Sequence, residues 1–243
     1  MQFRAYIQIL ALLGINNLNA TQTAQKLETE VARKVSIGYQ LYLPEKYEAE
    51  KDSKWPVILF LHGAGERGDN LEQVTVHGPP KLVRNGQDLP FVIISPQCPK
   101  NQIWDNEALV ALLDHVLVNH RCDPARVYLT GLSMGGFGTF SLGLAHPEKF
   151  AAIAPVCGGG EWIKVYAAKR SKPEAFKNLG VWAFHGGRDN VVKPEQSKRM
   201  IDALKKAGCK DVQFTIYPEA GHDSWTKTYD NPKLFEWFLS HSR

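Results

Sequence analysis

The stretch Gly131-Leu132-Ser133-Met134-Gly135 places a serine between two glycines, directly after the apolar run "RVYLT". This G-x-S-x-G spacing is typical of a nucleophile elbow, in which a serine stands on a sharp turn between a strand and a helix. Glycines two residues before and two after the serine keep bulky side chains away from that turn. A serine at a helix start can instead cap the helix with its hydroxyl. The pattern alone therefore predicts a nucleophile or a helix cap at Ser133.

A serine nucleophile needs a histidine as base and an acid that orients the histidine. The chain supplies Asp189 in "FHGGRDN" and His222 in "YPEAGHD", each after a later apolar run. This is the Ser-Asp-His order expected with such an elbow. Asp223 is a rival acid, which we interpret as a loop-structuring or solvated carboxylate. Because the histidine must be neutral to accept a proton, activity should rise with pH around neutrality.

The other histidines have simpler interpretations. His62 and His185 adjoin glycines at predicted strand ends, where we expect them to orient loops by hydrogen bonding. His77 falls in a loop whose path the sequence does not predict. The rest lie on or near predicted helices or in the C-terminal tail: His115, His120, His146 and His241.

The negative charge that develops on a carbonyl oxygen needs fixed N–H donors. One donor generally follows the nucleophile, and another comes from the loop after an early strand. We assign these donors to Met134 and to Ala64 in "LHGAGERGDN", with Gly63 as the alternative to Ala64. A glycine-rich turn with surface charges is a compatible interpretation of the same loop.

Buried strands must bring these residues together. An alternating run at 35–43 predicts a half-buried strand, and continuous apolar runs predict strands covered on both faces. Helical patterns lie between several of the runs, and Gly208 stands where a helix C-cap belongs. The fold class is therefore α/β, a mostly parallel central sheet with helices on both faces, and its site lies at the carboxyl ends of the strands. The continuous runs are 56–63, 90–96, 126–131, 150–156, 180–186 and 212–218, and the helical patterns are 106–120, 194–208 and 232–241.

The N-terminus carries one cation, Arg4, before a short apolar stretch and a small residue, Ala20. This pattern predicts a signal peptide over residues 1–20 and a single domain over 21–243, in a secreted or periplasmic protein. The stretch is too short for an ordinary membrane-spanning helix. The alternative is that residues 1–20 are a buried element of the domain, in a cytoplasmic protein.

Composition excludes several classes of partner and cofactor. The net charge is +4 from 29 basic and 25 acidic residues, and scattered charge of this size predicts no nucleic-acid partner. The chain lacks the glycine-rich phosphate and dinucleotide motifs, and its cysteines have no metal-ligand spacing, so we expect no cofactor and no metal. Buried free thiols are the simplest interpretation of the cysteines, although export would permit a disulfide. These are Cys98, Cys122, Cys157 and Cys209.

Six motifs, in this order, resemble a known group of proteins: "LHGAGERGDN", "SPQCP" followed by Trp104, "GLSMGGFGTF", "APVCGGG", "FHGGRDNVV" and "AGHDSWT". They resemble the compact α/β-hydrolase serine esterases related to acetylxylan and feruloyl esterases, phospholipase/carboxylesterase and dienelactone hydrolase-like proteins, and predicted prolyl-oligopeptidase-type peptidases. The resemblance implies the α/β-hydrolase fold with Ser133, Asp189 and His222 as catalytic triad. Dienelactone hydrolases use a cysteine nucleophile, so the serine favours the esterase branch.

The predicted function is hydrolysis of short-chain or aromatic esters. No long apolar lid follows "AAIAPV", and an open site favours a short acyl group or a bulky alcohol. Trp104, Trp162 and Trp225 fall in loops on the site face, where each lines a pocket, stacks on a sugar or phenolic ring, or only packs its own loop. With export, this predicts a carboxylesterase that removes acetyl or feruloyl-type groups from plant polysaccharide fragments. The alternatives are a serine peptidase of small peptides and a non-catalytic binding protein on a hydrolase scaffold.

Overall fold

The computed structural model describes residues 22–243, and the predicted signal peptide lies outside the described residues. A compact unit extends from Val35 to Arg243. The described residues that precede it, 22–34, contain no helix or strand. Among residues 22–243, no helix is both long and apolar enough to cross a membrane. The predicted domain start at residue 21 stays a prediction.

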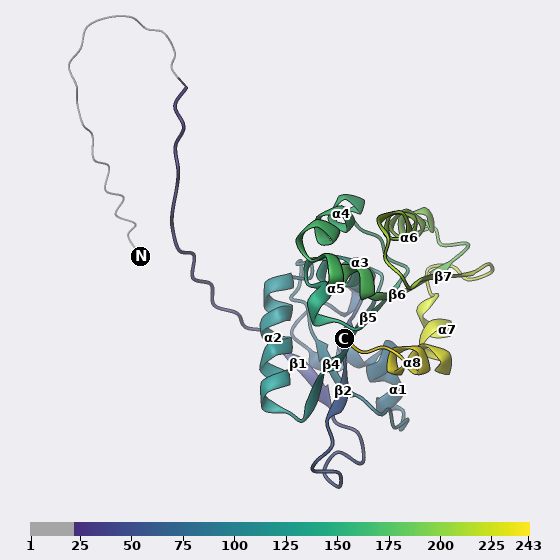
Figure 1. Cartoon of the computed structure of the whole chain (residues 1–243). Helices are drawn as coiled ribbons and strands as arrows, with labels where there is room; N and C mark the ends of the chain where they lie inside the picture. Colours follow the sequence, from purple (N-terminus) through teal and green to yellow (C-terminus); the bar gives the residue numbers. More distant parts are fainter. Residues whose placement is uncertain (1–21) are drawn as a thin grey trace, which may run out of the picture. The chain divides into compact units, whose positions relative to one another are not determined.

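The compact unit is built on one central sheet (Figure 1). Its described strands follow the order β1-β3-β2-β4-β5-β6-β7. β1 pairs antiparallel with β3, and the other neighbours pair in parallel. Each predicted apolar run forms a strand of this sheet, so the predicted α/β class is confirmed. The strands are β1 (Tyr39–Tyr42), β2 (Trp55–Leu61), β3 (Val92–Pro96), β4 (Cys122–Leu132), β5 (Ala152–Val156), β6 (Gly180–Gly186) and β7 (Val212–Tyr217).

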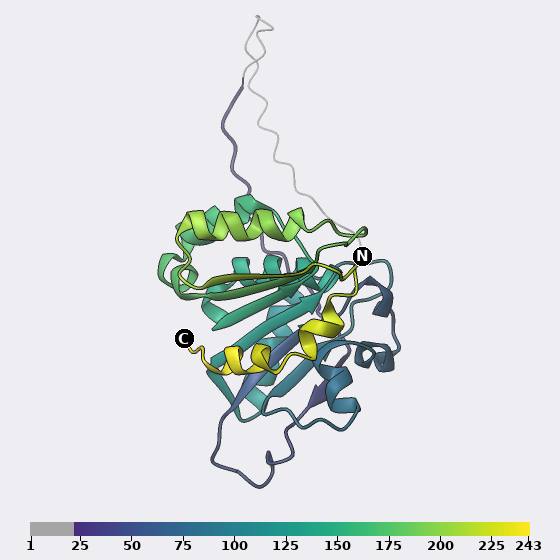
Figure 2. The same ribbon diagram turned by 90° about the vertical axis from the view of Figure 1, so that its right-hand side faces the viewer.

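Helices cover both faces of the sheet, as the continuous apolar runs predict. Figure 2 shows the yellow-green helix α6 and the yellow helix α8 on opposite faces. The described helices are α1 (Gly78–Arg84), α2 (Asn106–Asn119), α3 (Met134–Ala145), α4 (Trp162–Ser171), α5 (Pro173–Asn178), α6 (Glu195–Ala207), α7 (Trp225–Tyr229) and α8 (Pro232–Leu239).

Alternate residues of β2 belong to two separate cores. Leu59 and Leu61 pack with buried residues of α2, α3, α4 and α6. Ile58 and Phe60 pack instead with residues of α7 and α8. Because successive strand residues point to opposite faces, an unbroken apolar run is what a strand between two helical layers requires.

The predicted helices at 106–120, 194–208 and 232–241 form α2, α6 and α8. Gly208 follows α6 with φ of 93°, and its N–H bonds to carbonyl oxygens of the last turn, so the predicted C-cap is confirmed. Four helices have no counterpart in the pattern analysis: α1, α4, α5 and α7. They are short or mixed in polarity, and of α4 only the basic run at 167–172 reads as a solvated helix end. Sequence periodicity is a weak signal for such segments, because tertiary packing decides whether they are helical.

The parallel strands place their carboxyl ends along one edge of the sheet. β2 ends at Leu61, β4 at Leu132, β6 at Gly186 and β7 at Tyr217. The residues with predicted chemistry follow these strands within a few positions. The sheet therefore collects them at one edge, as expected for a site in an α/β fold.

Candidate active site

Ser133 occupies the sharp turn between β4 and α3. Its φ of 53° and ψ of −115° are unusual for a residue other than glycine. The turn is held by the Ser133 N–H, which donates to the Val156 carbonyl at 2.9 Å. The side chain makes no hydrogen bond that caps α3. Of the two roles open for this serine, the geometry therefore does not support the helix cap.

The two flanking glycines are required by close backbone contacts. A Cβ built on Gly131 would lie 2.6 Å from the carbonyl oxygens of Leu61 and Gly135. A Cβ on Gly135 would overlap the Leu61 carbonyl. Gly131 on β4 and Gly135 on α3 have no side chain, which allows the start of α3 to pack against the end of β2.

His222 links Ser133 to Asp189. Its Nε2 lies 2.9 Å from Ser133 Oγ, and its Nδ1 lies 2.7 Å from Asp189 Oδ2. An ionised carboxylate can only accept hydrogen bonds, so Nδ1 carries the imidazole proton. Nε2 is then free to accept the Ser133 hydroxyl proton. This is the arrangement that a serine nucleophile with its base and orienting acid requires.

The carboxylate of Asp189 is buried and fully engaged. Its side chain has no exposed surface, and its Oδ1 accepts the N–H groups of Val191 and Val192, each at 2.9 Å. Burial acts to raise the pKa of Asp189, but the bonds from His222 and from the Val192 and Val191 N–H groups outweigh it and lower the pKa. Asp189 is therefore held in its charged form, which accepts the hydrogen bond from His222 Nδ1–H.

His185 supports Asp189 from behind. It is fully buried, and its Nε2 lies 2.9 Å from the Val192 carbonyl oxygen and 3.3 Å from Asp189 Oδ2. Its Nδ1 lies 2.7 Å from Ser197 Oγ on α6. These contacts confirm the expectation that His185 orients a loop, and they show that the loop is the one bearing Asp189.

His62 orients the loop after β2. Its Nδ1 donates to the Gly63 carbonyl at 2.6 Å, and its Nε2 accepts the Cys98 N–H at 2.9 Å. Burial lowers the pKa of His62 to about 4 against a smaller opposing effect of the Gly63 bond, so the ring is neutral near pH 7. The predicted loop-orienting role of His62 is confirmed.

The two assigned oxyanion donors start helical turns at the ends of neighbouring strands. Met134 is the first residue of α3, and Ala64 is the first residue of a 3₁₀ turn, Ala64–Glu66, just after β2. N–H groups in the first turn of a helix have no partner within that helix. Gly63 lies beside the elbow, because a Cβ there would sit 2.8 Å from the Leu132 side chain. The loop after β2 therefore borders Ser133.

Two of the three predicted tryptophans lie near this centre. The Trp225 ring stands perpendicular to the His222 ring, with centroids 5.2 Å apart. The His77 ring also contacts Trp225, with ring centroids 5.4 Å apart, so the loop whose path the sequence did not predict brings this histidine to Trp225. The Trp104 indole N–H donates to the His62 carbonyl at 3.2 Å. Trp162 is the first residue of α4, half exposed and edge-on to Tyr166, and its predicted contact with substrate stays a prediction.

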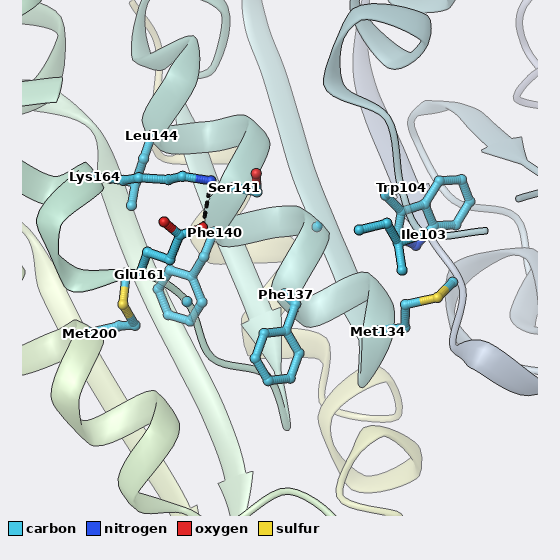
Figure 3. A pocket seen from close by; sticks show the side chains of 12 residues that line it. Ile103, Trp104, Met134, Phe137, Phe140, Ser141, Leu144, Glu161, Lys164 and Met200 are labelled. Carbon is cyan, nitrogen blue, oxygen red and sulfur yellow. Dashed lines mark ion pairs between the residues drawn. The ribbon is translucent and has the colours of Figure 1, made fainter. Parts of the chain in front are cut away.

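An elongated groove begins at Met134, the residue that follows Ser133, and was not predicted from the sequence. It has a volume of about 650 Å³ and runs along α3, from Met134 and Trp104 past Phe137 to Leu144 (Figure 3). The sequence does contain a signal for this groove: Met134, Phe137 and Leu144 are apolar and stand three and seven positions apart along α3. That signal is ambiguous, because the same spacing also describes a helix face packed in the core.

Each cysteine has a buried, free thiol: Cys98, Cys122, Cys157 and Cys209. The interpretation as buried free thiols is therefore confirmed. Cys157 Sγ, an Asp189 oxygen and a His222 nitrogen lie within 4.8 Å of one another, which is a possible metal-ligand set. Burial raises the pKa of Cys157 to about 12, and Asp189 and His222 already share a proton. A metal centre would need the Cys157 thiolate. The protonated Cys157 thiol and the Asp189–His222 hydrogen bond therefore do not favour a metal at these three residues.

The sequence pattern of the dienelactone hydrolase family matches residues 28–232. The chain belongs to the dienelactone hydrolase family. It is thus an α/β-hydrolase of the esterase type, and its family resemblance and fold class are both confirmed.

Several proteins resemble this dienelactone hydrolase family member. Acyl-protein thioesterase 1 of Gibberella zeae is 25% identical over 210 residues, which are 73% of this chain and 88% of that protein. Feruloyl esterase B of Thermothelomyces thermophilus is 27% identical, covering 82% of this chain and 79% of that protein. A solved thermostable esterase is 33% identical with a TM-score of 0.70, covering 85% of this chain and 60% of the esterase.

Proposed function

We propose that this family member is a serine carboxylesterase that works through an acyl-enzyme on Ser133. The observation that carries the proposal is the continuous hydrogen-bond chain from Ser133 Oγ through His222 to the buried carboxylate of Asp189. Structural hydrogen bonds alone would not require a serine in strained backbone geometry at the mouth of a groove. A strained residue at a ligand site is typical of function.

In the proposed mechanism, Ser133 Oγ attacks the ester carbonyl while His222 Nε2 takes the hydroxyl proton. The carbonyl oxygen becomes negative and accepts bonds from the N–H groups of Met134 and Ala64. Asp189 stabilises the charged imidazole through Nδ1. His222 then donates the proton to the leaving alcohol, the acyl–Ser133 ester forms, and water repeats the sequence to release the acid.

For the substrate we propose esters of short or aromatic acids, of acetyl or feruloyl type, on plant polysaccharide fragments. The support comes from relatives: feruloyl esterase B, and the bifunctional acetylxylan esterase/xylanase XynS20E of Neocallimastix patriciarum, 28% identical over 148 residues. Such a substrate is extracellular, which agrees with the proposed signal peptide at residues 1–20 and a secreted or periplasmic protein. Detection of a mature N-terminus at Thr21 after expression in an exporting host tests that part.

A serine peptidase of small peptides is the second candidate. Dipeptidyl peptidase family member 1 of Caenorhabditis elegans is 24% identical over 227 residues, although the chain spans only 28% of that protein. The same His222 would then protonate a leaving amine. Comparing kcat/KM on p-nitrophenyl acetate with that on peptide p-nitroanilides separates the two functions, and activity on the anilides alone would favour the peptidase.

Labelling by a fluorophosphonate probe tests the nucleophile. The wild-type protein should be labelled and should hydrolyse p-nitrophenyl acetate, and Ser133→Ala should abolish both. Ser240→Ala, on an exposed turn after α8, is the matched control and should label like the wild type. A folded wild-type protein that neither labels nor hydrolyses the ester would show that the chain is a non-catalytic binding protein instead.

A further inference from the structure

The groove along α3 has the shape of a track, and its near end is lined by Met134, the residue that follows Ser133. Ser133 itself does not line the groove. Met134, Phe137, Ser141 and Leu144 line it from α3, and they are spaced three, four and three residues apart. Such residues share one face of a helix. Ten helical residues separate the first from the last, so the track is about 15 Å long. Figure 3 shows Met134 and Trp104 at one end and Leu144 at the other.

The walls of the track are mostly apolar. Ile103 and Trp104 line the end near Ser133, and Phe140 and Met200 line the middle and far parts. At the far end Lys164 Nζ lies 2.9 Å from Glu161 Oε1. The two opposite charges form an ion pair, so neither is an unpaired charge in the groove. A mostly apolar groove whose two far-end charges are paired suits an uncharged hydrocarbon group better than a sugar or a charged ligand.

The path of the proton decides which half of an ester enters the track. His222 must reach the leaving alcohol to protonate it, so the alcohol lies on the His222 side of Ser133. Trp225 covers His222 there, and neither residue lines the groove. The groove begins instead at Met134, the proposed donor to the carbonyl oxygen. The group that extends into it is therefore the acyl group.

We propose that the α3 groove binds the acyl chain of the substrate and favours extended, unbranched alkanoyl chains of medium length. The proposal rests on the proposed esterase function of Ser133, and it assigns this site a preference for longer acyl chains than the acetyl group considered above. An acetyl group leaves the groove empty, and an aromatic acyl group fills its near part between Trp104 and Phe137. A medium-length chain reaches the far end, where Leu144 and Met200 lie.

The size of the effect follows from burial of methylene groups. Full burial of one methylene raises binding about fourfold, and an open groove that covers one side of the chain should give roughly twofold. Between acetyl and octanoyl esters, kcat/KM should therefore rise on the order of 50-fold. Palmitoyl esters should gain nothing more, because that chain outgrows the track.

The experiment measures kcat/KM on p-nitrophenyl acetate, butyrate, octanoate and palmitate with the full chain. Ser141→Phe places a ring about two-thirds of the way along the track, and the octanoate-to-acetate ratio should fall about tenfold, since three or four methylenes lose their contacts. Val118→Phe adds the same bulk at an exposed site on α2, 84% exposed, and is the matched control.

A second variant keeps the test open if Ser141→Phe fails to fold. Lys164→Trp, at a half-exposed position at the far end, should shorten the longest acyl chain that still raises kcat/KM. The proposal is overturned if the wild type prefers acetate to octanoate, or if Ser141→Phe lowers both by one factor with an unchanged melting temperature. It is also overturned if alkyl acetates of growing alcohol length show the dependence instead. Activity on acetate that needs Ser133, without a chain-length preference, would refute the groove assignment and leave the esterase function standing.

Discussion

The two oxygens of the Asp189 carboxylate have different partners, so an asparagine in its place would turn its NH₂ group toward His222. Oδ1 accepts two backbone N–H groups, from Val191 and Val192, and Oδ2 accepts the Nδ1–H of His222. In Asp189→Asn the amide oxygen must stay with the two backbone donors, because an NH₂ group there would face two other donors. The NH₂ group therefore points at His222.

That orientation changes the tautomer of His222. The amide NH₂ donates to Nδ1, so the ring proton moves to Nε2, and Nε2 can no longer accept the Ser133 proton. The loss of kcat should be about 10⁴-fold, which is the size expected when a triad histidine is locked in the wrong tautomer. This corresponds to about 5 kcal/mol of transition-state stabilisation. The change is isosteric, so the fold should be kept.

The assay is the steady-state hydrolysis of p-nitrophenyl acetate, with the melting temperature measured alongside. The neighbouring Asp223→Asn is the matched control. Asp223 accepts the Thr226 N–H and hydroxyl, each at 3.1 Å, and so holds the start of α7 as a loop-structuring acid. Its activity should stay within about threefold of wild type, because surface substitutions are usually mild. A folded Asp189→Asn protein that keeps more than a tenth of wild-type kcat would refute the reasoning.

Three further predictions follow from buried groups. Gly135→Ala should lower the free energy of unfolding by about 3 kcal/mol or more, since its Cβ would overlap the Leu61 carbonyl, and chemical denaturation measures this; an unchanged midpoint would disprove the tight elbow. The lowered pKa of His62 means that the unfolded chain binds a proton between pH 6.5 and about 4 while the folded chain does not, so stability should fall by about 3 kcal/mol as pH falls through that window. His62→Phe should flatten that dependence, and a slope equal to that of wild type would contradict it. Ellman's reagent should find no reactive thiol in the native protein and four after denaturation, because every cysteine is buried and free; fewer than four in denaturant would reveal a disulfide.

Much of the fold could be predicted because its signals are local. Continuous apolar runs give strands buried on both faces, and the alternation of strands with amphipathic helices gives a parallel sheet. The helices α1, α4, α5 and α7 escaped prediction, because they are held by packing rather than by their own periodicity. Trp162 and Trp225 show the same limit, since loop positions were expected for both and they are the first residues of α4 and α7.

The sequence by itself determined the parallel sheet, the serine between glycines and the Ser-Asp-His order, because each depends on residue types at fixed spacing along the chain. Only the tertiary structure decided that Ser133 Oγ faces His222 rather than its own helix, that His185 backs Asp189, and that a groove opens along α3. These are contacts between residues tens of positions apart, and their distances depend on how strands and helices pack. The absence of a lid led to an expectation of short acyl groups, whereas the packing of α3 against α4 and α6 provides an apolar track without one.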